Sequence, residues 1–346
     1  MTPIVFPSPP RRILIIKPSA IGDVVHALPV LNLLRRRWPD AHVSWLVTPA
    51  CAGLLERHPM LDEVIRFERR ELGRGWRSPR AAAELVRFTR DLGRRSFDLV
   101  IDLQGLFRSG WLARVTGAPF RVGPANAREG AWLFYTHRVP TGSPEQHAIE
   151  RYLTIGQAVG CERGPVEFPF AVDDADRAHV AALTPGRYAV LMPGANWLTK
   201  QWPVERFASL VGPLRERFGL ESVVAGGPDV ADLAEKVPAA VSLVGRTNLR
   251  QLVALLERAA LVVANDSGPM HIAAALGRPL VTPFGPTNPV RTGPYRRMDS
   301  VVRVDIPCSP CYSRRCSHVS CLRWIETEPV LEVARRQMNG QAAGAG

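Results

Sequence analysis

The sequence has few lysines for so basic a chain. Only three of its 44 basic residues are lysine, so the formal net charge of +12 comes almost entirely from arginine. The arginines are scattered rather than gathered into blocks, which argues against a dedicated nucleic-acid-binding arm. This distribution favours a soluble enzyme with arginine-rich faces, or an anionic partner such as phosphate groups or acidic lipid.

Several targeting and binding signals are also missing. The amino terminus, MTPIVFPSPPRR, has no apolar h-region, so we expect no signal peptide. No stretch of about 18 uncharged apolar residues occurs, so we expect a cytoplasmic chain without a membrane-spanning helix. In a reducing compartment its six cysteines are not expected to form stable disulfides. No Gly-x-Gly-x-x-Gly follows the first apolar run, which disfavours a dinucleotide-dependent oxidoreductase.

What the sequence does contain is a regular alternation of apolar runs and amphipathic segments. RILIIKP (Arg12 to Pro18), HVSWLVTP and FDLVIDLQG (Phe97 to Gly105) are typical of buried strands, and DVVHALPVLNLLRRRWP of a helix. An arginine- and alanine-rich region from Arg69 to Arg95 is predicted to be helical. A second series of strands and helices begins near Tyr188. Repeated strand–helix order predicts parallel sheets with right-handed crossovers.

A polar segment with a Pro-Gly turn, from Phe170 to Arg187, separates the two series. With 346 residues the chain is long enough for two domains. We therefore predict an α/β protein with two doubly wound Rossmann-like domains facing a central cleft, at residues 1–175 and 176–325. Residues 326–346 are expected to form a helix that packs back towards the N-terminal domain and then a flexible tail. Ligands of such sheets bind at the carboxyl ends of the strands.

The stretch VVANDSGPMHIAAALGRPLV places polar residues between a buried strand and a helix of small residues. Ser267 is suited to cap that helix, with Pro269 near its first position. The N–H groups of the helix start favour an anion, and Gly268 lets a phosphate approach the backbone. A simple cap with a glycine turn is the alternative. Asp266 and His271 lie on either side of the same spot, where a carboxylate would accept hydrogen bonds from sugar hydroxyls.

Four motifs, in the right order, resemble those of glycosyltransferase family 9, the heptosyltransferases that build the inner core of bacterial lipopolysaccharide. They are ILIIKPSAIGDVVHALPVLNLLRRRWPDAHVSWLV, DLVIDLQGLFRSGWLA, PGANWLTKQWPVERFASL and NDSGPMHIAAALGRPLVTPFGPTNP. The resemblance runs from about Arg12 to Val333. It implies a GT-B fold, with the acceptor on the N-terminal domain and the nucleotide sugar on the C-terminal domain. The implied reaction is a metal-independent, inverting transfer of heptose from ADP-heptose to Kdo-lipid A or heptosyl-Kdo-lipid A.

Inverting transfer needs a base that takes the proton of the acceptor hydroxyl as it attacks the anomeric carbon. The resemblance gives this role to Asp23, which on its own would more often be the N-cap of a helix. It assigns to Lys200 the stabilisation of the negative charge on the leaving diphosphate. Gly22 is expected to permit a tight turn before the helix. Ser19 and His26 flank that turn, and His26 is alternatively a packed helix residue.

Further loops of the C-terminal half would complete the donor site. Asn196 can donate to a phosphate, whereas Ala195 stands where relatives often carry a hydroxyl and offers only its N–H. Asp229, after a Gly-Gly pair, would bind the ribose hydroxyls or simply cap a helix. Val244 and Gly245 would line the adenine pocket with main-chain atoms. The expected donor-binding residues are Asn196, Lys200, Asp229, Val244, Gly245, Asp266, Ser267, Gly268, Pro269 and His271.

The acceptor's phosphates or acidic sugars would suit the fork geometry of arginine. Gln104 follows a predicted strand, in the segment DLQG, and two arginines lie downstream of it. The expected acceptor-binding residues are Ser19, Gly22, His26, Gln104, Arg108 and Arg121.

Four cysteines, Cys308, Cys311, Cys316 and Cys321, have the spacing Cys-x2-Cys-x4-Cys-x4-Cys. Four thiols in so short a segment could bind structural zinc or an iron–sulfur cluster, with His318 as a replacement ligand. The spacing does not fit the paired pattern of zinc ribbons, and unligated or paired thiols are the alternative. No cofactor is expected to be required for catalysis.

The expected partners are a nucleotide-sugar donor, a lipid-linked oligosaccharide acceptor and the inner membrane surface. We expect no nucleic-acid partner and a monomeric protein, held at the inner face of the cytoplasmic membrane by its cationic surface. Two alternatives remain open: a related glycosyltransferase with another nucleotide sugar and acceptor, and a catalytically inactive nucleotide-binding protein.

Overall fold

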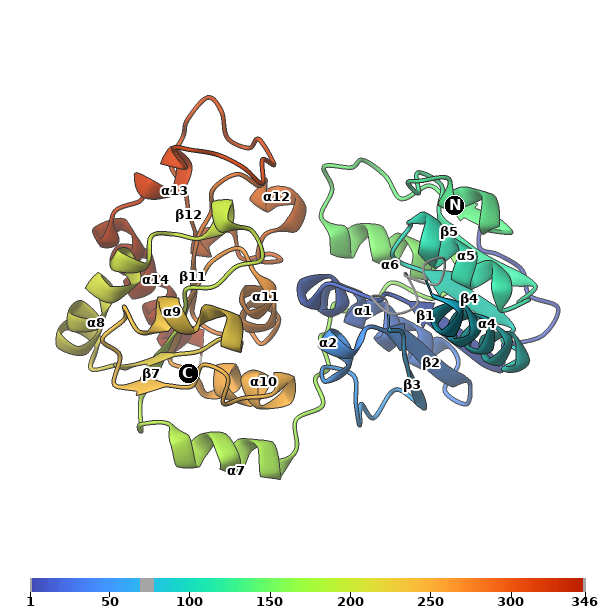
Figure 1. The fold of residues 1–346 in the computed structure, drawn as a ribbon, viewed down its shortest axis with the longest axis horizontal. Helices are drawn as coiled ribbons and strands as arrows, with labels where there is room; N and C mark the ends of the chain where they lie inside the picture. The colour runs from blue at the N-terminus through green and yellow to red at the C-terminus, as the bar shows by residue number, and fades with distance from the viewer. Residues whose placement is uncertain (1, 69–77, 345–346) are drawn as a thin grey trace. The chain divides into compact units, whose positions relative to one another are not determined.

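The computed structural model describes residues 2–68 and 78–344, and it divides the chain into two compact units, Met1–Ala171 and Val172–Gly346 (Figure 1). The division lies at the start of the polar segment that separates the two strand–helix series of the sequence. Part of the helix predicted between Arg69 and Arg95 lies outside the described residues, and its described part is α4 (Pro79–Arg94). No helix of the described ranges is long and apolar enough to cross a membrane.

The first unit is built on a six-stranded parallel sheet in the order β3-β2-β1-β4-β5-β6. Its central strands are short apolar runs with both faces covered, as parallel strands require. In β1, for example, the residues from Ile13 to Ile16 are all fully buried. The strands are β1 (Arg12–Ile16), β2 (His42–Val47), β3 (Glu63–Arg66), β4 (Leu99–Asp102), β5 (Phe120–Pro124) and β6 (His137–Val139).

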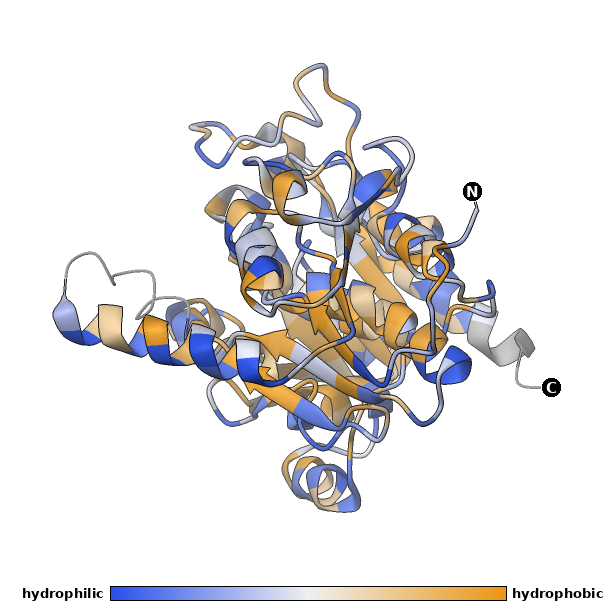
Figure 2. Cartoon of the chain, turned by 90° about the vertical axis from the view of Figure 1, so that its right-hand side faces the viewer, coloured by the Kyte–Doolittle hydropathy of each residue, from blue (hydrophilic) through white to orange (hydrophobic). Residues whose placement is uncertain are grey.

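Helices cover the sheet of the first unit, and they mix hydrophilic and hydrophobic residues, whereas the strands are mostly hydrophobic (Figure 2). Every residue of α1 from Val24 to Leu34 is buried, because this helix packs on the sheet and against α6 as well. The helices of this unit are α1 (Ile21–Arg37), α2 (Pro49–Ala52), α4, α5 (Phe107–Val115) and α6 (Ala148–Ala158), with a 3₁₀ turn, η2 (Ala131–Phe134).

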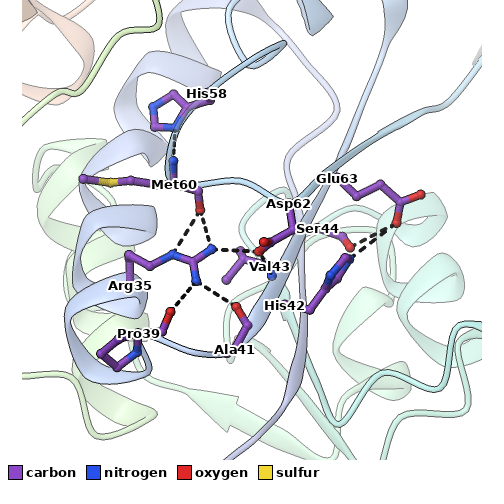
Figure 3. A network of polar contacts seen from close by, with 10 residues as sticks. All are labelled: Arg35, Pro39, Ala41, His42, Val43, Ser44, His58, Met60, Asp62 and Glu63. Atoms are coloured by element: carbon purple, nitrogen blue, oxygen red, sulfur yellow. Dashed lines mark hydrogen bonds and ion pairs between the residues drawn. The ribbon is translucent and has the colours of Figure 1, made fainter.

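Arg35 fastens the end of α1 to the loops around β2 (Figure 3). Its guanidinium donates to the backbone oxygens of Met60, Pro39 and Ala41 and to the Asp62 carboxylate, at 2.7–2.8 Å for the shortest contact with each. Burial alone would raise the pKa of Asp62, but the Val43 N–H and Arg35 outweigh it and lower that pKa. The network therefore ties the last turn of α1 to the loops on either side of β2.

The second unit repeats this topology. Its sheet has the order β12-β11-β10-β7-β8-β9, which is the same order as in the first unit when the strands are counted from β7. This is the order of the doubly wound dinucleotide-binding folds. The strands are β7 (Tyr188–Met192), β8 (Glu221–Val224), β9 (Val241–Ser242), β10 (Leu261–Ala264), β11 (Leu280–Pro283) and β12 (Val301–Val302).

The connections of the second unit carry several short helical turns. The longer helices are α7 (Asp174–Leu183), α8 (Val204–Phe218), α10 (Leu249–Arg258), α11 (Gly268–Ala275) and α14 (Thr327–Gly344). The short ones are η3 (Leu198–Lys200), η4 (Pro228–Val230), α9 (Ala231–Ala234), α12 (Pro289–Thr292), η5 (Met298–Ser300) and α13 (Ser320–Arg323).

The C-terminal helix packs where the sequence did not lead us to expect. α14 lies against α8, β11 and β12, and its residues Val330, Leu331 and Ala334 are buried in the core of the second unit. The expectation that residues 326–346 pack back on the N-terminal domain is therefore corrected. The apolar face of this helix completes the core of its own unit, a match that depends on the three-dimensional course of the intervening loops.

Candidate active site

Asp23 occupies the third position of α1, directly after the loop that follows β1. One carboxylate oxygen, Oδ2, accepts from the Ala20 N–H at 3.2 Å, so the residue does cap its helix. The other oxygen, Oδ1, lies 3.4 Å from Lys17 Nζ and 3.5 Å from the Tyr152 hydroxyl, which donates to it. The side chain is nevertheless 44% exposed. Capping and access to a substrate are thus compatible at this position.

Lys17 is a buried cation behind that carboxylate. Its Nζ donates to the Tyr152 hydroxyl at 2.7 Å and to the Leu103 carbonyl at 3.2 Å. Burial by itself would lower the pKa of Lys17, but the charge of Asp23, the hydrogen bond to Tyr152 and the charge of Asp102 outweigh it and raise that pKa. The lysine is therefore charged at neutral pH. We did not single it out from the sequence, although it is one of only three lysines and directly follows a strand.

The other residues predicted around the turn before α1 are Ser19, Gly22 and His26, and the last two lie within the helix. Gly22 lies inside α1 as its second residue, so it does not form the tight turn expected from the sequence. His26 is buried, and its ring contacts that of His147 with 5.1 Å between the centroids. This is the packed-helix alternative for His26. Ser19, in contrast, lines a cavity.

That cavity has a volume of about 280 Å³ and lies in the first unit. Ser19, Gln104, Phe107, Arg108 and Glu129 are among its lining residues. The Oε1 atom of Gln104 is buried and has no hydrogen-bond partner. A buried polar atom without a partner is costly, so a ligand donor is the expected counterpart. The cavity thus brings together three of the predicted acceptor residues.

Arg121 is used differently. Its guanidinium donates to the carbonyl oxygens of Phe134 at 2.9 Å and Ala118 at 2.5 Å. It therefore fastens the loop around η2 and is not among the residues that line the cavity. Phe107 and Glu129 line it instead, and neither was predicted from the sequence.

In the second unit, Lys200 and Asp266 meet at the carboxyl ends of two neighbouring parallel strands, β7 and β10. Lys200 Nζ lies 2.7 Å from Asp266 Oδ2, and both side chains are largely buried. The same Oδ2 atom accepts from the Thr287 hydroxyl at 2.6 Å. Lys200 Nζ also lies 4.5 Å from the centre of the Trp197 ring. Thr287 and Trp197 are additions to the predicted site, and only their positions after strands could have indicated them.

Ser267 is the N-cap residue of α11, but its hydroxyl makes no capping hydrogen bond. Its Oγ atom is buried and without a partner. Gly268 and Pro269 form the first turn, and His271 is buried within the helix. The first N–H groups of a helix have no partner inside the helix and carry partial positive charge. Together with Lys200, this end of the sheet is suited to an anion.

The other predicted donor residues lie in loops after β7, β8 and β9. Asn196 and Asp229 are exposed, and Val244 is half-buried. Gly245 has a φ of +68°, which favours glycine, and its N–H donates to the Gly226 carbonyl at 3.0 Å. The loops after β8 and β9 are therefore adjacent.

The Gly-Gly pair has a structural explanation. A Cβ atom at Gly226 would overlap the Cγ2 atom of Val230, so the glycine is required by packing within the unit. The steric requirement arises from Val230 and needs no ligand.

The cysteine-rich segment follows β12. Cys308 and Cys311 are exposed, Cys316 is half-buried and Cys321 is buried, and none forms a disulfide. Within the described ranges there is no group of three or more His, Cys, Asp or Glu side chains placed to hold a metal ion, so the geometry gives no support to the zinc alternative.

The segment instead touches the loop of Lys200. The Thr199 hydroxyl donates to the Ser313 carbonyl at 2.8 Å. The guanidinium of Arg314 lies 4.7 Å from the centre of the Trp197 ring, which Lys200 also contacts. These contacts give the segment a supporting place beside the predicted donor site.

Comparison with known proteins places this geometry in context. The sequence model of glycosyltransferase family 9 (heptosyltransferase) matches residues 85–321, more than half of the chain. Lipopolysaccharide heptosyltransferase 1 of Pseudomonas aeruginosa is 34% identical over 318 residues, which is 89% of this chain and 88% of that protein.

Solved structures agree with the sequence relatives. The glycosyltransferase family 9 protein of Veillonella parvula has a TM-score of 0.80 at 24% identity, covering 95% of this chain and 98% of its own. The Escherichia coli heptosyltransferase WaaC with ADP has a TM-score of 0.74 at 29% identity, covering 94% and 99%. The two doubly wound units are thus those of a GT-B fold.

Proposed function

This chain belongs to glycosyltransferase family 9 and is a glycosyltransferase, and from that premise we propose that it transfers a heptose from ADP-heptose to the inner core of lipopolysaccharide. Kdo-lipid A or heptosyl-Kdo-lipid A is the proposed acceptor. The observation that carries the proposal furthest is the anion-binding end of the second sheet, where Lys200 and the unpartnered Ser267 hydroxyl lie beside the start of α11.

In the proposed reaction Asp23 removes the proton of the acceptor hydroxyl while that oxygen attacks the anomeric carbon of the heptose. The bond from this carbon to the diphosphate oxygen breaks on the opposite face, which inverts the configuration and releases ADP. Lys200 and the N–H groups of α11 stabilise the negative charge that develops on the diphosphate. Because these groups supply positive charge, we propose that no divalent cation is needed.

Asp266 has a different proposed role from the one its sequence position indicated. Its Oδ2 atom already accepts from Lys200 and Thr287, and its side chain is buried. We therefore assign it to positioning Lys200 rather than to binding the sugar hydroxyls. Val244, Gly245, Asp229 and the loop of Asn196 remain the proposed surroundings of the nucleotide.

The test is a donor panel. The purified protein is incubated in EDTA with an acceptor and with ADP-heptose, ADP-glucose or UDP-glucose, and the products are identified by mass. Transfer from ADP-heptose alone supports the proposal. Preference for a hexose donor would favour the related transferase, an alternative that Ala195 motivates because it brings no hydroxyl to the phosphate. Nucleotide binding without transfer would favour the inactive protein.

Ser267→Ala is expected to weaken ADP binding by about tenfold or more, because a hydrogen bond to a charged group contributes about 1.5–3 kcal/mol. The thermal stability of the free protein should hardly change, since the hydroxyl has no partner to lose. Calorimetric titration with ADP and thermal melting measure the two quantities. Ser209→Ala, at an exposed hydroxyl on α8, is the matched control. Equal ADP affinity of Ser267→Ala and wild type would contradict this contact.

Lys17→Met is expected to lower kcat by about tenfold and to move the acid limb of the pH–rate profile to higher pH. The reason is that the ionised Asp23 loses its buried counter-charge at 3.4 Å. Lys17→Arg should restore part of the rate, and Lys236→Met, at an exposed lysine, should behave as wild type. If the pH–rate profile of Lys17→Met is not shifted, Lys17 does not act through the charge of Asp23 and its role is structural.

A further inference from the structure

We propose that the first unit docks on an anionic lipid bilayer through the α5–η2 surface, defined by Phe107, Trp132 and Leu133. These large apolar side chains are 52%, 37% and 64% exposed. They belong to two adjacent elements, because α5 packs against η2 and the Phe107 ring contacts that of Phe134, the residue after Leu133, with 5.3 Å between centroids. Exposed apolar side chains gathered in one place mark an interaction site, whereas single ones need no explanation.

The charge around this surface favours acidic lipid. From Leu103 to Val139 the sequence carries five arginines and one acidic residue. Arg108, Arg128 and Arg138 are exposed. The Arg138 guanidinium lies 4.6 Å from the centre of the Trp132 ring, and its Nε donates to the Trp132 carbonyl. Tryptophan with adjacent basic side chains suits the bilayer interface, where the ring lies among headgroups and the cation meets lipid phosphate.

The position of the surface relative to the acceptor cavity points to a membrane rather than to another protein. Phe107 belongs to the α5–η2 surface and also lines the cavity with Ser19, Gln104 and Arg108. A lipid-linked saccharide therefore needs to rise only a short way from the bilayer to reach the cavity. This step rests on the proposed function, because it takes the acceptor to be lipid-linked.

The first test measures binding to vesicles. The full-length protein is sedimented with vesicles of phosphatidylcholine alone or of phosphatidylcholine with phosphatidylglycerol. We expect binding to the anionic vesicles that weakens as salt is raised, and a loss of about tenfold or more in the double variant Trp132→Glu with Leu133→Glu. Val290→Glu, at a valine of the second unit that is 56% exposed, should bind as wild type.

Several results would contradict the proposal that the α5–η2 surface docks on a membrane. One is wild-type binding by the double variant, and another is absence of wild-type binding to anionic vesicles. The third is loss of binding in Val86→Glu, an exposed position of α4, with the double variant unaffected. A dimer of the protein in solution that the double variant abolishes would also assign the surface to a second copy of the chain.

The second test uses turnover. With ADP-heptose, the double variant should match wild type on a deacylated, water-soluble acceptor and fall about tenfold on the same acceptor embedded in vesicles. A misfolded variant would lose both activities. If wild type transfers sugar to neither acceptor, the proposed function fails. Vesicle sedimentation then still tests, independently of turnover, whether the α5–η2 surface binds the membrane.

Discussion

Asp23→Asn is expected to lower kcat by about 10²–10⁴-fold, the usual contribution of a general base, while ADP binding is kept. The amide cannot accept the proton of the acceptor hydroxyl. Its oxygen can still accept from the Ala20 N–H, so the start of α1 is preserved. The measurement is single-turnover transfer from ADP-heptose together with calorimetric titration of ADP.

The control for this variant is Asp62→Asn. Asp62 is 41% exposed, and like Asp23 it pairs with a basic side chain and accepts from a backbone N–H. Losing the ion pair with Arg35 should lower the melting temperature without lowering turnover. Asp23→Ala, which also removes the cap, separates the loss of the base from the loss of the cap. If either Asp23 variant turns over at close to the wild-type rate, Asp23 is not the general base.

Lys200→Ala is expected to lower kcat by about 10²–10³-fold, as the loss of one preorganised charge-stabilising donor does. Donor affinity should fall with it, because the lysine would contact the diphosphate before and during bond breaking. The variant also leaves the buried Asp266 without its partner at 2.7 Å. Removal of one member of a buried pair destabilises a protein by about 3–5 kcal/mol.

The double variant Lys200→Ala with Asp266→Asn separates these two effects. Neutralising Asp266 should return most of the lost stability, since no buried charge is then unpaired. Turnover should stay as low as in the single variant. Lys236→Ala, at an exposed lysine of the same unit, controls for the loss of a positive charge. Donor affinity and rate equal to wild type in Lys200→Ala would exclude the phosphate role.

The fold could be predicted where strands are long apolar runs. β1, β2, β4 and β10 were predicted from such runs, and β7 begins the second series near Tyr188, as predicted. β3, β5 and β6 were not predicted, because each has only one or two buried residues and so lacks a continuous apolar run. The two-residue strands β9 and β12 are shorter than any periodic pattern can reveal.

The candidate site divides in the same way. Asp23, Lys200 and Ser267 each follow a strand, and strand ends can be located from sequence. Their partners cannot, because Tyr152 is 129 residues from Asp23 and Thr287 is 21 residues from Asp266. Such pairs are created when parallel strands bring their carboxyl ends to one edge of a sheet.

The sequence by itself determined the alternation of strands and helices, the two-unit organisation and the motifs of the glycosyltransferase family. These features are local, since each depends on apolar periodicity or on residues close together in the chain. Only the tertiary structure decided that Lys17 and Tyr152 hold Asp23, that Asp266 is committed to Lys200, and that Gly226 is required by Val230. It also decided that α14 completes the second core and that α5, with its exposed Phe107, packs against η2, with its exposed Trp132 and Leu133. Contacts of this kind join distant segments, and the chain must pack before any of them exists.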